Sequence, residues 1–228
     1  MIQHIAFIMD GNRRWARAQG IQALYGDESK KAVETALAYC LKQAIPFLSL
    51  YTFSLENMKR SSSETEYVFN LAVENIEKML PLFIEKNIKI SFVGERAVFP
   101  ESLLHTIKTV EEATKTAAKL HVSILFCYGG QQEIVQAAQT IAYKVARQEL
   151  DPAAITPELF KNYLQTAPVP FPELIIRTGG CKRLSNFLLY QAAYSELYFL
   201  DCLWPELTEQ DITTCVEQYK TIKKNFGV

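Results

Sequence analysis

Residues 4–17 of the chain read HIAFIMDGNRRWAR. The apolar run at 5–9 has the length of a strand and no polar alternation, as expected of a strand that is buried on both faces. An acid, a glycine and three arginines follow it within eight positions. The stretch therefore predicts an inner strand of a parallel sheet whose carboxyl end carries charged side chains.

Five further apolar runs of strand length recur along the chain, and the segments between them have the apolar spacing of helices. The run at 88–93 alternates polar and apolar residues, so we expect it nearer an edge of the sheet. This alternation predicts an α/β fold with a single domain over residues 1–228, a mostly parallel six-stranded sheet flanked by helices. The predicted strands are 5–9, 47–53, 88–93, 122–127, 174–176 and 197–200.

The composition excludes several classes of protein. With 24 basic and 25 acidic side chains in 228 residues, the net charge of −1 argues against a surface built to hold nucleic acid. No apolar run approaches the roughly 18 residues of a spanning helix, so we expect no transmembrane segment. Five cysteines without a Cys-x-x-Cys pair predict neither a disulfide framework nor a zinc site, and they suit a reducing cytoplasm.

Cationic side chains follow three of the predicted strands. Ligands of open parallel sheets bind beyond the carboxyl ends of the strands, so these side chains are expected on one rim. Guanidinium groups bind phosphate or carboxylate oxygens two at a time, and neither a P-loop nor a dinucleotide fingerprint occurs in the chain. The rim therefore predicts an anion site built mainly from arginines. Its cations are Arg13, Arg14, Arg17, Lys59, Arg60, Arg177, Lys182 and Arg183.

One acid, Asp10, stands at the end of the first strand beside these cations. A carboxylate facing phosphate oxygens repels them unless a hard cation lies between, and Mg²⁺ commonly binds through one or two carboxylates plus substrate phosphates. Asp10 therefore predicts a Mg²⁺ site, with Glu196 as a second candidate carboxylate. Asp10 is equally a candidate N-cap of the helix that follows.

Several sequence blocks, taken in order, carry a family resemblance. They are HIAFIMDGNRRWA, LYTFSLEN, LIIRTGG, RLSNFLL with AAYSELYF, and LWPE. Between residues 2 and 226 the chain resembles the cis-prenyltransferase family, above all its bacterial undecaprenyl diphosphate synthases. The resemblance implies a homodimeric cytoplasmic enzyme with a hydrophobic tunnel. It also implies Mg²⁺-dependent condensation of isopentenyl diphosphate onto an allylic diphosphate, usually farnesyl diphosphate. The product is then a long polyprenyl diphosphate with cis double bonds for cell-wall lipid carriers, and its release implies peripheral membrane contact.

The resemblance also assigns roles to residues. It makes Asp10 the catalytic aspartate that engages Mg²⁺ and the diphosphates, and Asn57 the position that handles the proton. Glu196 becomes a second metal-associated carboxylate, contributed across the dimer, and Leu120 stands near the tunnel floor. The implied substrate-binding residues are Gly11, Asn12, Arg13, Arg14 and Trp15, then Ser54, Leu55, Glu56, Met58 and Arg60, and finally Arg177, Arg183, Leu184 and Ser185.

The chain departs from the family pattern at several positions. An arginine and a histidine that usually follow the first block are Ala23 and Asp27 here. Both changes remove cationic or proton-donating character near the allylic diphosphate, which predicts lower turnover or substrate affinity. The other departures are Cys127 for asparagine, Cys181 for glutamate, Lys182 for histidine and Asn225 for arginine.

Two alternatives stay open at this point. The departures are compatible with a diverged noncatalytic subunit that stabilises a partner, although the retention of Asp10, Asn57 and the rim arginines favours catalysis. A phosphatase could also be built on Asp10 as a nucleophile at the end of the first strand. That hypothesis is weakened because Asn12 occupies the position of the second aspartate.

Overall fold

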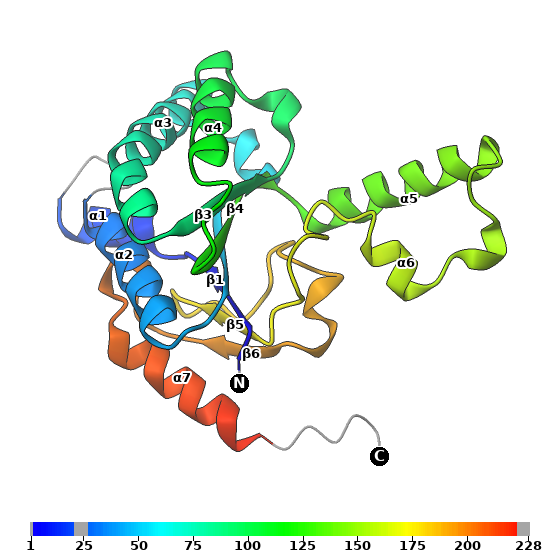
Figure 1. Ribbon diagram of the computed structural model, residues 1–228. Helices are drawn as coiled ribbons and strands as arrows, with labels where there is room; N and C mark the ends of the chain where they lie inside the picture. Colours follow the sequence, from blue (N-terminus) through cyan, green and yellow to red (C-terminus); the bar gives the residue numbers. More distant parts are fainter. Residues whose placement is uncertain (1, 21–26, 223–228) are drawn as a thin grey trace.

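A computed structural model describes residues 2–20 and 27–222. Its centre is one six-stranded sheet in the order β3-β4-β2-β1-β5-β6, and every strand pair in it is parallel (Figure 1). The predicted α/β class is confirmed, and the alternating strand lies at an edge as expected. The strands are β1 (His4–Ile8), β2 (Phe47–Ser54), β3 (Ile88–Val93), β4 (Leu120–Tyr128), β5 (Leu174–Arg177) and β6 (Glu196–Phe199).

Helices connect the strands in the way that parallel pairing requires. Among the described residues, no helix combines the length and apolar character needed to cross a membrane. The α-helices are α1 (Asn12–Ala18), α2 (Asp27–Lys42), α3 (Ser62–Glu85), α4 (Glu101–Ala113), α5 (Gly130–Ala146), α6 (Pro157–Lys161) and α7 (Glu209–Thr221). Short 3₁₀ helices are η1 (Leu55–Lys59), η2 (Arg96–Val98), η3 (Pro152–Ala154), η4 (Gln191–Tyr194) and η5 (Trp204–Glu206).

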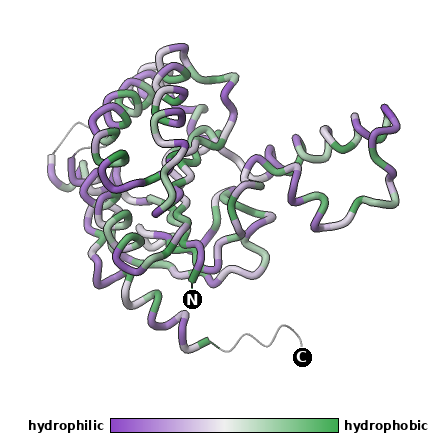
Figure 2. Tube along the Cα trace, in the orientation of Figure 1, coloured by the Kyte–Doolittle hydropathy of each residue, from purple (hydrophilic) through white to green (hydrophobic). Residues whose placement is uncertain are grey.

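The two faces of the sheet are covered differently. Because side chains alternate along a strand, Ile5 and Phe7 of β1 join the larger cluster, with buried residues of α2, α3, α4 and α7. Ala6 and Ile8 join a smaller cluster on the other face, where Phe187 packs against the sheet. The central strands are accordingly mostly green in Figure 2, whereas the helices mix green and purple.

The segment 150–172 is rich in proline, which is typical either of a linker between domains or of a surface excursion within one domain. In the structure this segment contains η3 and α6, and it follows directly on α5. Helices α5 and α6 project together from the body of the molecule, as Figure 1 shows. The excursion is therefore an arm rather than a linker between domains.

The strand order decides which loops meet. The chain passes from β1 to β2 on one side of β1 and later returns to place β5 on its other side. In the parallel register Ile8 lies opposite Arg177, so the loops after β1 and β5 leave the sheet side by side. Reversals of this kind form the crevices where parallel sheets bind ligands.

His4 is a buried titratable group at the start of β1. The residue is 1% exposed; Nδ1 lies 2.6 Å from the carbonyl oxygen of Pro170, and Nε2 lies 2.8 Å from Oγ of Ser49. A carbonyl oxygen only accepts, so Nδ1 carries the proton and Nε2 accepts from the serine hydroxyl. Desolvation by burial lowers the pKa of His4 to about 4.

We expect His4 to make the fold acid-sensitive. Its pKa is lower in the folded than in the unfolded chain, so its contribution is complete above about pH 6.5 and is lost as the pH falls towards 4. Between pH 7.5 and 4.5 the free energy of unfolding of the wild type should fall by about 2–3 kcal/mol more than that of His4→Asn. The asparagine amide retains a donor for Pro170 without titrating. Denaturant unfolding at both pH values measures this difference, and equal losses would exclude His4 as the cause.

Candidate active site

A polar hollow of about 560 Å³ lies beyond the carboxyl ends of β1, β2 and β5. The predicted rim therefore exists, because the loops of three strands meet there. Residues that line it are Asp10, Gly11, Asn12, Arg13, Arg14 and Arg17 after β1; Tyr51, Thr52, Phe53, Ser54, Asn57 and Arg60 at the end of β2; and Arg177, Arg183 and Ser185 after β5, together with Ile8 and Met9.

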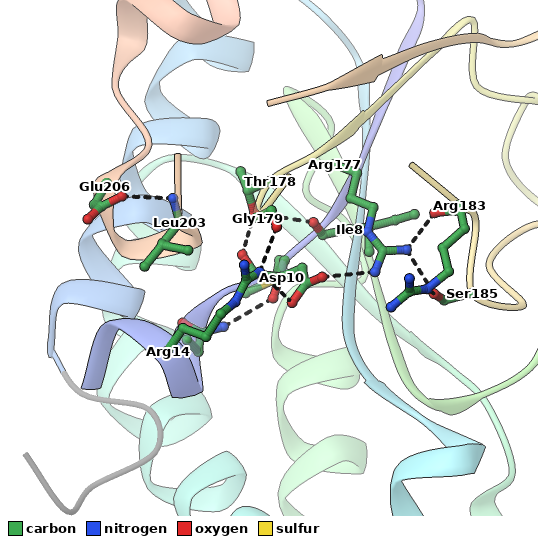
Figure 3. A network of polar contacts seen from close by, with 12 residues as sticks. Ile8, Asp10, Arg14, Arg177, Thr178, Gly179, Arg183, Ser185, Leu203 and Glu206 are labelled. Carbon is green, nitrogen blue, oxygen red and sulfur yellow. Dashed lines mark hydrogen bonds and ion pairs between the residues drawn. The ribbon is translucent and has the colours of Figure 1, made fainter. Parts of the chain in front are cut away.

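Two residues that line this hollow, Arg177 and Asp10, form an ion pair (Figure 3). Nη2 of Arg177 donates to Oδ2 of Asp10 at 2.8 Å, and Nη1 donates to Oγ of Ser185 at 2.8 Å and to the carbonyl oxygen of Arg183. Arg177 is only 4% exposed, whereas the Asp10 side chain is 30% exposed. A buried guanidinium thus fixes one side of the carboxylate and leaves the rest of it accessible to a ligand.

The backbone of Asp10 is held by two donors. Oγ1 of Thr178 donates to the Asp10 carbonyl oxygen at 2.7 Å, and the amide of Trp204 donates to the same oxygen at 3.0 Å. The cap of α1 is Gly11, with φ at 113°, and Asp10 makes no side-chain cap bond. The N-cap interpretation of Asp10 is therefore wrong, since its carboxylate pairs with Arg177 instead.

Arg14 brings a second cation to the same carboxylate. Its Nη2 donates to the Gly179 carbonyl oxygen at 2.7 Å and lies 3.6 Å from Oδ1 of Asp10. Gly179 has φ at 86°, and a Cβ there would lie 2.4 Å from Arg14 Nη2 and 3.2 Å from Cγ of Asp10. Only glycine leaves room for this arginine beside the carboxylate.

The turn after β2 is ordered by a reciprocal cap. The amide of Asn57 donates to Oγ of Ser54 at 3.3 Å, and Oδ1 of Asn57 accepts from the Ser54 amide at 3.2 Å. Oε1 of Glu64, at the start of α3, lies 2.9 Å from Nη1 of Arg60 and 3.5 Å from Nη1 of Arg13. This one acid therefore brings cations from two separate elements to the same side of the hollow.

The structure does not bring every predicted residue into the hollow. Trp15 is half-buried in α1, and the Sδ of Met58 lies 3.6 Å from the Sγ of Cys127. Glu56 accepts a hydrogen bond from Asn186 at 2.7 Å. Among the described residues, those predicted for the substrate site or rim that do not line the hollow are Trp15, Leu55, Glu56, Met58, Lys59, Lys182 and Leu184.

Glu196 is placed far from Asp10 within the chain. It opens β6 and pairs with Leu174 at the start of β5, whereas the hollow begins at the other end of β5 with Arg177. In this arrangement Asp10 and Glu196 of the same subunit therefore cannot bind one metal ion together.

Sequence reasoning missed two residues of the site, Tyr51 within β2 and Thr178 just after β5. Tyr51 belongs to an apolar run, yet its hydroxyl donates to the carbonyl oxygens of Tyr128 at 3.1 Å and Ser185 at 3.3 Å. Burial raises the pKa of Tyr51, so the hydroxyl remains a donor. Thr178 was also missed, and its only signal in the sequence is that it directly follows Arg177.

An apolar cavity of about 160 Å³ lies between α2, α3 and the sheet. It follows α3 from Val68 to Phe83, which corresponds to roughly 22 Å at 1.5 Å per residue. Met9, Asn12 and Thr52 line both this cavity and the polar hollow, so the two are contiguous. Oδ1 of Asn12 is buried there without a hydrogen-bond partner among the described residues.

The end of the cavity away from the polar hollow lies near the amino ends of β3 and β4. Val122 of β4 and Ile90 of β3 line it, and they are register partners. Two residues nearer the start of each strand, on the same face of the sheet, Leu120 and Ile88 form the next register pair. Both are buried, and neither lines the cavity. Leu120 therefore lies directly beneath the floor, and its effect on product length stays a prediction.

The comparison with protein families decides the identity of the chain. Residues 8–227 match the prenyltransferase family described as "Putative undecaprenyl diphosphate synthase". The chain belongs to this prenyltransferase family. The resemblance seen in its sequence blocks is thereby confirmed, and the chain is a prenyltransferase.

Individual relatives agree with this assignment. The isoprenyl transferase of Thermotoga maritima is 38% identical over 226 residues, covering 99% of this chain and 96% of that one. The (2E,6E)-farnesyl-diphosphate-specific ditrans,polycis-undecaprenyl-diphosphate synthase of Coxiella burnetii is 35% identical with the same coverage. The crystal structure of lavandulyl diphosphate synthase from Lavandula x intermedia with dimethylallyl diphosphate superposes with a TM-score of 0.92 at 28% identity, covering 100% of this chain and 98% of that one.

The departures from the family pattern are only partly visible. Ala23 and Asn225 lie outside the described residues, whereas Asp27 begins α2. Cys127 has φ at 48°, a left-handed conformation that asparagine adopts more readily than cysteine. Burial raises the pKa of the Cys127 thiol to about 12, so it is protonated and inert at neutral pH.

We expect Gly179→Ala to weaken anion binding by about tenfold or more, because the new methyl group displaces Arg14 from beside Asp10. Gly20→Ala is the matched control: Gly20 also has positive φ, at 67°, but no described atom lies within 4 Å of its added Cβ. Both variants should lose about 1–2 kcal/mol of stability from backbone strain. Calorimetric titration with inorganic diphosphate and Mg²⁺ measures binding, and equal affinities in the two variants would contradict the role of Gly179.

Proposed function

We propose that this prenyltransferase condenses isopentenyl diphosphate onto an allylic diphosphate, farnesyl diphosphate in the first instance, and releases a long-chain cis-polyprenyl diphosphate. The observation that carries the proposal is that the polar hollow and the apolar cavity are contiguous. A cation-lined hollow suits a diphosphate, an apolar cavity suits a hydrocarbon tail, and both share Met9, Asn12 and Thr52. One amphiphilic substrate would occupy both.

The residues around Asp10 fit a Mg²⁺ ion that is bound partly by the protein and partly by the phosphate oxygens of the substrate. In the part of the chain that the structure describes, no three His, Cys, Asp or Glu side chains converge into a metal cage. One accessible carboxylate is what Mg²⁺ uses when phosphate oxygens supply its other ligands. We propose that Asp10 holds Mg²⁺, and that the ion, when bound, neutralises charge on the diphosphate.

The protein groups divide the work of the condensation. The carbon–oxygen bond to the allylic diphosphate breaks, a carbon–carbon bond forms to the terminal alkene carbon of isopentenyl diphosphate, and a proton leaves the product. Arg13, Arg14 and Arg60 would stabilise the charge that develops on the leaving diphosphate, and the apolar cavity keeps water from the carbocation. Arg177, Arg183 and Ser185 would bind isopentenyl diphosphate, and Asn57 would handle the proton.

Chain growth requires the apolar cavity to widen. A cavity of about 160 Å³ is close to the size that holds a benzene-sized ligand, which is far smaller than a farnesyl tail. We therefore propose that the tail separates α2 from α3 and that the floor near Val122 and Leu120 limits its length. Undecaprenyl diphosphate, for cell-wall lipid carriers made in the cytoplasm, is the product we propose from the farnesyl-specific relative in Coxiella burnetii.

We further propose a homodimer. Helix α5 and the loop after it expose large apolar side chains on the projecting arm: Val135 is 54%, Tyr143 72% and Ile155 40% exposed. Tyr194 and Leu197, exposed by 78% and 41%, flank Glu196 in the same way. If a second copy packs against β6, Glu196 could reach the site of the partner subunit. A metal-binding role for Glu196 requires this, because Glu196 lies far from Asp10 of its own chain.

Asp10→Ala tests the assignment. Purified wild type, incubated with radiolabelled isopentenyl diphosphate, farnesyl diphosphate and Mg²⁺, should form butanol-extractable polyprenyl diphosphate, and Asp10→Ala should lose at least about 10²-fold in kcat. The far-UV circular dichroism of the variant should be unchanged, because Thr178 and Trp204 contact only the backbone of Asp10, but its melting temperature should fall because the buried Arg177 loses its carboxylate partner.

The product is then extracted and its chain length measured by mass spectrometry. Retained turnover in Asp10→Ala would contradict its role, and a wild type that forms no product would support a noncatalytic subunit. Release of inorganic phosphate from the substrates would instead indicate the phosphatase alternative.

A further inference from the structure

Asn186 joins three elements around the hollow without lining it. Its Oδ1 accepts from the amide of Gln131 at 2.8 Å, and its carbonyl oxygen accepts from the amide of Gly130 at 2.7 Å, both at the start of α5. Its Nδ2 donates to Oε1 of Glu56 in η1 at 2.7 Å and to Oε1 of Gln132 at 3.0 Å. A single side chain thus connects η1, α5 and the loop that carries Ser185.

Asparagine suits this position for two independent reasons. The backbone of Asn186 has φ at 65°, a left-handed conformation that asparagine tolerates better than most residues. The side chain must also accept on one side and donate on the other, which an amide does and a carboxylate does not. Aspartate would keep the bond from Gln131 but would place a second negative charge against Glu56.

Glu56 is ionised in this contact. Partial burial raises the pKa of Glu56, but hydrogen bonds from its own backbone, from Asn186 and from Ser54, together with the charge of Lys59, outweigh burial, so the net pKa lies below the usual value. Asn186 therefore donates to an anion, which makes the bond stronger than one between neutral groups.

The two loops that Asn186 joins carry different parts of the site. Glu56 lies in the turn between Ser54 and Asn57, which both line the hollow. On the other side, Ser185 directly precedes Asn186, and its Oγ accepts from Nη1 of Arg177 at 2.8 Å and from Nε of Arg183 at 3.2 Å. Movement of Asn186 would change the separation between Asn57 and these arginines.

We propose that Asn186 is a positioning residue for the condensation. Through Glu56 and Ser185 it sets the distance between the turn that carries Asn57 and the pocket for isopentenyl diphosphate. This inference rests on the proposed function, because the two loops are assigned to that reaction. It adds a residue that contacts no substrate, and it gives Glu56 a role in holding the site together instead of in substrate contact.

The test reverses the polarity of one hydrogen bond. Asn186→Asp removes the donor to Glu56, so the KM for isopentenyl diphosphate should rise about tenfold and kcat should fall, while the KM for farnesyl diphosphate stays within about twofold. In the double variant Asn186→Asp with Glu56→Gln, the glutamine amide donates to the new carboxylate. The double variant should recover most of the loss.

Gln132→Ala is the matched control, because it removes the other acceptor of Asn186 Nδ2 and leaves the Glu56 bond intact. Its KM values should stay within about twofold of the wild type. Thermal melting of each variant separates a shift in KM from loss of folded protein. A merely structural role for Asn186 would lower kcat and stability without the selective effect on one substrate.

An unchanged KM for isopentenyl diphosphate in Asn186→Asp would overturn the inference, as would a double variant no better than the single one. If the wild type forms no polyprenyl product, the proposed function fails separately. In that case the Kd for isopentenyl diphosphate with Mg²⁺, measured by calorimetry in the same variants, still decides whether the Asn186–Glu56 bond shapes the pocket.

Discussion

The contact between Arg177 and Asp10 is the interaction on which the rim depends. Burial of the Arg177 side chain, which is only 4% exposed, is costly unless its donors are satisfied; Asp10, Ser185 and the Arg183 carbonyl oxygen accept from its two Nη atoms, while its buried Nε has no partner among the described residues. The pair exists only because β1 and β5 are neighbours, so that their carboxyl ends reach the same point. Removal of either side chain would leave the other charge without its partner, which destabilises the protein. The pair therefore ties the loops after β1 and β5 to each other.

The same arrangement divides the molecule into a charged end and an apolar interior. Helices α2 and α3 cover one face of the sheet with an apolar cavity between them, and the cavity opens at Asn12 onto the cations of the rim. Low net charge and high hydrophobic content are thus compatible with a site that grips a diphosphate, because the cations are concentrated at one edge. This division explains how a chain without a membrane-spanning helix among its described residues can handle a lipid.

The fold could be predicted because strands buried on both faces read as continuous apolar runs, and most of the rim because its charged residues directly follow those runs. What lay beyond prediction depends on side-chain direction and on strand order. Tyr51 was hidden inside an apolar strand, Glu56 turned towards Asn186 instead of the hollow, and Glu196 fell at the opposite end of the sheet. The projection of α5 could not be predicted either, because an amphipathic helix has the same apolar spacing whether it packs on its own sheet or extends away from the body of the molecule.

The most direct test of this account is a crystal structure with Mg²⁺ and farnesyl thiolodiphosphate, an unreactive analogue of the allylic substrate. We expect the diphosphate to lie against Asp10, Arg13 and Arg14. The tail should pass Asn12 and enter a widened cavity between α2 and α3. A tail that lies outside that cavity, or a diphosphate bound away from Asp10, would contradict the claim that the two spaces hold one substrate.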